Sequence, residues 1–174
     1  MSTSILFQKI LLFGCSYLRM VLSIEVKGIR QGEQIPVEFT CDGNNRSPEV
    51  KIENPPSGTR SLALIMEDPD APVGLFVHWV LINIGPEVTQ IKGDMGKSIR
   101  TREGFVQGKN DFGKIGYDGP CPPRGHGFHR YYFKLYALSS SLNVTEPVTR
   151  EKVVKAMEGK VLGQAEVIGR YKRD

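Results

Sequence analysis

Short apolar and alternating segments recur along the chain at intervals that leave little room for long helices. Segments 22–27 and 49–53 alternate apolar and polar residues, which is typical of strands with one exposed face. The runs 61–66 and 78–84 are apolar and rich in Val, Ile and Leu, so we predict buried strands there. These elements favour a sheet protein.

The C-terminal third carries the clearest periodicity. Segment 130–138 alternates aromatic with polar residues and predicts a strand, with 161–171 as a final strand. One helix is predicted over 147–158, where Thr145 or Glu146 precedes a first-turn Pro147 and Gly159 offers a stop. The expected faces of segment 130–138 are Tyr132, Lys134 and Tyr136 on one side, and Tyr131, Phe133, Leu135 and Ala137 on the other. Many short strands and one helix predict a mainly β, antiparallel sandwich.

Composition bounds the function classes. The 174 residues suit a single domain, and a net charge of +4 without a stripe of basic and aromatic residues argues against a nucleic-acid partner. Three cysteines are too few for a disulfide framework. A Cys41–Cys121 bond is one interpretation, but reduced thiols in a reducing compartment are the simpler one, so we expect a cytoplasmic protein.

The first twenty residues are treated separately. Gln8 and Lys9 interrupt their apolar run, which is too short for a membrane span or the core of a signal peptide, so no stable membrane insertion is expected. We interpret 1–20 as an N-terminal extension or a mis-assigned start, and 21–174 as the single folded domain.

Two loops rich in proline and glycine hold all three histidines or lead into them. The first is Asp68-Pro69-Asp70-Ala71-Pro72, shortly before His78 and Trp79; the second runs from Gly116 to Tyr131 and contains His126 and His129. Proline restricts and glycine widens backbone conformation, so such loops are shaped rather than loose. Shaped loops with titratable groups are frequent binding sites.

Four separated blocks resemble the phosphatidylethanolamine-binding protein family, also known as the Raf kinase inhibitor protein family. They are residues 41–48 (CDGNNRSP), 61–72 (SLALIMEDPDAP), the His78-Trp79 strand and the loop 116–131. The short C-terminus and the Cys-Pro-Pro form of the loop are similar to compact prokaryotic members. The resemblance implies a large central antiparallel β-sheet packed against a smaller sheet, with few peripheral helices.

The resemblance also implies a small anion pocket for phosphate-like groups or a phosphoethanolamine head group. Alone, Asp68 and Asp70 would be interpreted as turn formers and His78 as a core histidine; the paired loops and the resemblance favour a site. The residues implied are Asp68, Asp70, His78, Gly119, Cys121, His129 and Tyr131.

Other residues of these loops receive weaker assignments. His126 is expected to be exposed and at best a gate, Arg130 to brace the structure against an acidic loop residue, and Tyr117 to serve either packing or the pocket. The residue types are compatible with two further chemistries. The Asp/Asp/His/His set could hold zinc or iron and Cys121 could be a thiol nucleophile, but the resemblance supports neither a metal nor catalysis.

The implied function is non-catalytic, without a cofactor. Members of the resembled family modulate other proteins, and for a compact prokaryotic-type member we expect a serine protease inhibitor. The alternative is a binder of phosphorylated small molecules or phospholipid head groups with no protein target, and an enzyme such as a phosphate-ester hydrolase ranks third. The resemblance also implies a homodimer.

Overall fold

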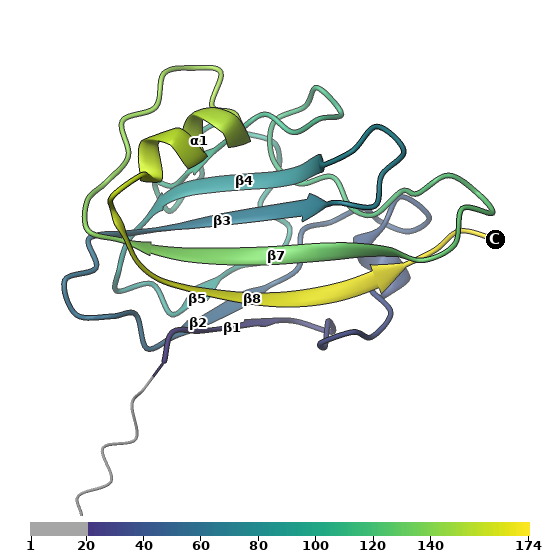
Figure 1. The fold of residues 1–174 in the computed structure, drawn as a ribbon, viewed down its shortest axis with the longest axis horizontal. Helices are drawn as coiled ribbons and strands as arrows, with labels where there is room; N and C mark the ends of the chain where they lie inside the picture. The colour runs from purple at the N-terminus through teal and green to yellow at the C-terminus, as the bar shows by residue number, and fades with distance from the viewer. Residues whose placement is uncertain (1–20) are drawn as a thin grey trace, which may run out of the picture.

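Two antiparallel sheets packed on one another form the body of the protein (Figure 1). The computed structural model describes residues 21–174, so the expectation for residues 1–20 lies outside the described residues. The smaller sheet has the order β1 (Ser23–Val26), β2 (Val50–Glu53), β5 (Gln90–Ile91). The larger sheet has the order β6 (Val106–Gln107), β4 (Phe76–Ile84), β3 (Ser61–Asp68), β7 (His129–Leu138), β8 (Val161–Tyr171). The mainly β, antiparallel fold class is confirmed.

The central strand β3 is buried at all eight positions because both faces of the larger sheet are covered there. Leu62, Leu64 and Met66 face the smaller sheet and join the main core. Ala63 and Ile65 point to the opposite face, into a second core beneath helix α1 (Arg150–Met157). Alternation of side chains along a strand produces this division. It also explains why residues 61–66 are apolar without a break.

Strand β7 confirms the predicted faces. Tyr131, Phe133, Leu135 and Ala137 are buried, whereas Tyr132, Lys134 and Tyr136 are only partly buried. Tyr131, Phe133, Leu135 and Ala137 belong to the main core. The alternation in the sequence therefore arises because one face of β7 packs against the smaller sheet and the other faces outward.

The predicted helix start was wrong by three residues. Helix α1 begins at Arg150, with Thr149 as the N-cap whose side chain accepts a hydrogen bond from the Lys152 N–H. Pro147 therefore precedes the helix. A short 3-10 helix, η1 (Val37–Phe39), and strands β5 and β6 were not predicted. No helix in residues 21–174 is long and apolar enough to cross a membrane.

The antiparallel register gathers three chain segments at one end of the larger sheet. Strand β3 ends where β4 and β7 begin: Asp68 is paired with Phe76, and Glu67 with Tyr132. The β3–β4 connection, the segment that precedes β7 and the C-terminus all lie at this end (Figure 1). The two proline-rich loops thus meet at this end of the sheet.

Candidate functional site

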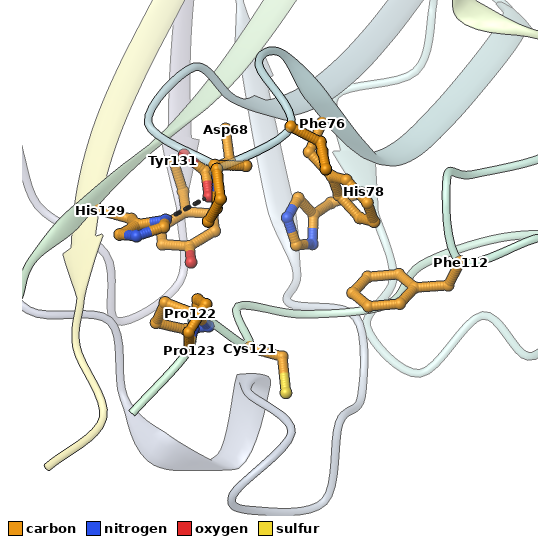
Figure 2. Close-up of a pocket in the computed structure, with 12 residues that line it drawn as sticks. Asp68, Phe76, His78, Phe112, Cys121, Pro122, Pro123, His129 and Tyr131 are labelled. Atoms are coloured by element: carbon orange, nitrogen blue, oxygen red, sulfur yellow. Dashed lines mark hydrogen bonds and ion pairs between the residues drawn. The ribbon is translucent and has the colours of Figure 1, made fainter. Parts of the chain in front are cut away.

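A cavity of about 290 Å³ opens between the two proline-rich loops. Figure 2 shows Asp68, Tyr131 and His129 on one side, His78 and Phe112 on the other, and Cys121 with Pro122 and Pro123 opposite the strands. The residues that line the cavity are Asp68, Ala71, Pro72, Val73, Phe76, His78, Phe112, Cys121, Pro122, Pro123, His129 and Tyr131. The polar groups are few and converge from β3, β4 and β7, while the walls are apolar.

Five of the seven predicted site residues line this cavity: Asp68, His78, Cys121, His129 and Tyr131. Asp70 and Gly119 are not among the residues that line it.

Asp70 turns away from the cavity to hold Arg130. Its Oδ1 lies 2.7 Å from Nη2 of Arg130, and its Oδ2 accepts from the Arg130 backbone N–H at 2.9 Å. These hydrogen bonds, with the guanidinium charge, lower the pKa of Asp70. The expectation that Arg130 braces the structure against an acidic loop residue is confirmed.

Gly119 has a structural role beneath the cavity. Its backbone N–H donates to Oδ1 of Asn45 at 2.7 Å and is not free for a ligand. A Cβ at this position would lie 1.9 Å from the Phe39 carbonyl oxygen, so only glycine fits.

Asp68 both forms the turn and reaches the site. Its Oδ1 accepts from the Asp70 N–H at 2.8 Å, as a turn-forming aspartate does. Its Oδ2 lies 2.7 Å from Nδ1 of His129, and both side chains are buried (Figure 2). Since a carboxylate accepts, Nδ1–H of His129 donates, and Nε2 is left as the second nitrogen, on the other side of the ring.

His78 is held as a neutral imidazole. Nδ1 lies 2.7 Å from the Asp118 carbonyl oxygen, so this nitrogen donates. Burial lowers the pKa of His78, and the nearby Asp118 carbonyl and Asp68 carboxylate only partly oppose that effect. The ring packs edge-to-face on Tyr131, with 5.2 Å between ring centroids. One nitrogen is therefore satisfied by the backbone, as in a core histidine, and the ring also lines the cavity.

The Tyr131 hydroxyl makes no hydrogen bond of normal distance and angle, although the Asp68 carboxylate is close enough to influence it. It is the one buried side-chain polar atom in the described residues without a partner, and the tyrosine is fully buried. Burial, together with the negative charge of Asp68, raises the pKa of Tyr131, so the phenol keeps its proton. A buried O–H group without a partner at the wall of a cavity can donate a hydrogen bond to a ligand that enters the cavity.

A hydrogen-bonded cluster under the cavity was missed at the sequence level. Asp118 is buried, and its carboxylate accepts from Asn110 at 2.8 Å and from Asn45 at 3.0 Å. Burial would raise the pKa of Asp118, but these bonds and the ammonium of Lys97 outweigh it and lower the pKa. Asn45 has a φ of 53°, a left-handed conformation that Asn tolerates. In the sequence, Asn45 lies in the block 41–48, which carries the family resemblance but was assigned no site residue.

Cys41 and Cys121 form a disulfide, so the interpretation that both are reduced was wrong. Their Cα atoms lie 5.4 Å apart although 80 positions separate them in the chain. The Cys41 N–H also donates to the Pro120 carbonyl at 3.1 Å. The bond ties the segment after η1 to the wall of the cavity and removes the thiol that a Cys121 nucleophile would need. The expectation of a cytoplasmic protein was based on reduced thiols, so the disulfide removes its support.

The donor set does not resemble a metal centre. No group of three or more His, Cys, Asp or Glu residues within residues 21–174 is arranged to hold an ion. The considered set is dispersed because Asp70 pairs with Arg130 and His78 is tied to a carbonyl.

Comparison with known proteins gives a consistent result. The sequence profile of the phosphatidylethanolamine-binding protein family matches residues 25–172. A UPF0098 protein of Aquifex aeolicus is 47% identical over 155 residues, covering 88% of this chain and 90% of the relative. One of Pyrococcus horikoshii is 45% identical, with 87% and 78% covered.

Solved structures agree. A putative phosphatidylethanolamine-binding protein homologue of Chlamydia trachomatis superposes with a TM-score of 0.79 at 36% identity, covering 88% of this chain and 99% of that one. Escherichia coli YbcL, described as a new member of the mammalian PEBP family, gives 0.81 at 31% identity with the same coverage. A carboxypeptidase Y inhibitor in complex with its proteinase shares the fold at a TM-score of 0.50 and 16% identity, with 89% and 84% covered.

Proposed function

Since the chain belongs to the phosphatidylethanolamine-binding protein family, we propose that it binds a small phosphate-like ligand in the cavity between the two loops, without turnover. The observation that carries the proposal is the buried, unpartnered hydroxyl of Tyr131. Leaving such a group unsatisfied costs about 1–3 kcal/mol, and a ligand oxygen would remove that cost.

The other polar groups suit the same ligand. Nε2 of His129 can donate to an anion once the ring is protonated, because Nδ1 already donates to Asp68. Asp68 can accept from a phosphate hydroxyl or a ligand amine. No Lys or Arg is among the described residues that line the cavity, so a ligand with its own positive group, such as phosphoethanolamine, would bring part of the compensating charge.

Titration calorimetry with inorganic phosphate and phosphoethanolamine tests this proposal. His129→Ala removes a charge-assisted hydrogen bond of about 1.5–3 kcal/mol, so affinity should fall about ten- to a hundredfold. Asp68→Asn and His78→Ala should also weaken binding. Equal affinities in the wild type and these three variants would contradict the proposed site.

Serine protease inhibition is retained as a second proposal, and one surface feature favours it. Val73, on the connection between β3 and β4, is 81% exposed, so a large apolar side chain stands free beside the cavity. Chymotrypsin- and elastase-like proteases accept apolar side chains in their specificity pockets.

Incubation with both proteases at several-fold molar excess tests inhibition. Val73→Asp should relieve it, whereas Val37→Asp, at another exposed valine on η1, should not. Undiminished protease turnover with the wild type would end this proposal and leave a ligand binder without a protein target.

A further inference from the structure

His126 makes a hydrogen bond that the sequence does not suggest. Its Nδ1 lies 2.7 Å from Nε2 of His129, with the ring centroids 5.0 Å apart and the ring planes inclined by 64°. His129 is buried and His126 is exposed. Together with the bond from His129 to Asp68, this forms a continuous chain of hydrogen bonds from the end of β3 to the protein surface.

Both nitrogens of His129 are therefore occupied. An imidazole nitrogen offers one in-plane position, either a proton or a lone pair. Asp68 takes the position at Nδ1, and His126 takes the position at Nε2. A ligand oxygen bound to Nε2 of His129 must lie where Nδ1 of His126 lies, so the two contacts exclude each other.

His126 can leave without disturbing the strands. It lies between Gly125 and Gly127, whose φ values are 73° and 84°. Its own backbone N–H donates to the Pro123 carbonyl at 3.2 Å, and the Gly125 N–H donates to the Arg173 carbonyl at 3.0 Å. The backbone of this turn is thus held in place while the exposed side chain is free to rotate toward solvent.

We propose that His126 is a displaceable gate of the ligand site, and that the ligand enters by taking its place at Nε2 of His129. This inference rests on the proposed ligand binding. It assigns a role to a residue that does not itself line the cavity. Because entry breaks one hydrogen bond, the gate should lower the affinity about two- to tenfold.

Two substitutions separate a gate from a ligand-binding residue. Titrated with inorganic phosphate at one pH and salt concentration, His126→Ala should bind about two- to tenfold more tightly than the wild type. His126→Asn should bind as the wild type does, because its side-chain amide lies close to where Nδ1 was and can keep the contact. Weaker binding by both variants would mean that His126 donates to the ligand, and would overturn the gate.

A measurement without ligand keeps this inference distinct from the proposed function. Diethyl pyrocarbonate modifies accessible imidazole nitrogens, and peptide mapping resolves the three histidines of the chain. His129 should react faster in His126→Ala than in the wild type, while His78, tied to the Asp118 carbonyl, serves as the internal reference. Equal rates at His129 would overturn the gate. If neither the wild type nor the His126 variants bind phosphate, the proposed function fails. The rate at which diethyl pyrocarbonate modifies His129 then decides by itself whether His126 covers His129.

Discussion

Two buried tyrosines differ in what their hydroxyl groups contact. Tyr117 donates to the Phe39 carbonyl at 2.5 Å, whereas Tyr131 has no partner. Tyr131→Phe should therefore leave the free energy of unfolding unchanged or raise it by up to about 1 kcal/mol, while it weakens phosphate binding. Tyr117→Phe, the matched control, should lower the free energy of unfolding by about 1–3 kcal/mol. Urea unfolding and calorimetry check both; a destabilised Tyr131→Phe would mean that its hydroxyl is satisfied.

His78 links stability to pH. Burial lowers the pKa of His78 in the folded state, while an unfolded histidine titrates near ~6.5. Below that pH the unfolded chain binds the proton first, so stability falls as the pH falls. Between pH 7 and pH 5 the wild type should lose up to about 2 kcal/mol more than His78→Gln. Asp42, Asp70 and Asp118 have lowered pKa values and titrate below this window. Parallel stability curves would show that folding does not lower the pKa of His78, and would contradict the prediction.

At the scale of elements, the disulfide joins two segments that no strand pairing connects. Cys41 follows η1 and Cys121 lies in the segment before β7, 80 positions away. Closing a loop of this length restricts the unfolded chain, so reduction should cost about 2–5 kcal/mol. Urea unfolding with and without a reductant measures this cost. Cys41→Ser should reproduce it and make the protein insensitive to the reductant; a wild type unaffected by reductant would contradict the prediction.

At the scale of the whole molecule, the homodimer stays a prediction that rests on resemblance. Sedimentation equilibrium at micromolar concentration should give about twice the chain mass of 19.4 kDa. Oligomers of identical chains are commonly twofold-symmetric, so one surface would serve both copies. A single species with the mass of one chain at all concentrations would refute it.

The predictability of the elements depended on their length. Strands β3, β4, β7 and β8 have 8 to 11 residues, long enough for an apolar run or an alternation to stand out in the sequence. Strands β5 and β6 have two residues each, too few to show any period, and exist through pairing with β2 and β4. The start of α1 was misplaced because Thr145, Glu146 and Thr149 are all plausible caps. In the structure Thr149 is the cap, because its side chain accepts from the Lys152 N–H.

The sequence by itself determined the sheet fold, the faces of β7 and the two loops that carry the chemistry, because periodicity and turn residues act over short distances. Only the tertiary structure decided which groups converge. Asp68 enters the cavity and Asp70 pairs with Arg130, since the chain turns between them. Cys41 meets Cys121 because two segments 80 positions apart lie side by side, and His126 meets His129 because the turn before β7 folds its side chain back onto the strand. Contacts of this kind depend on where backbones lie in space, which spacing along the chain does not encode.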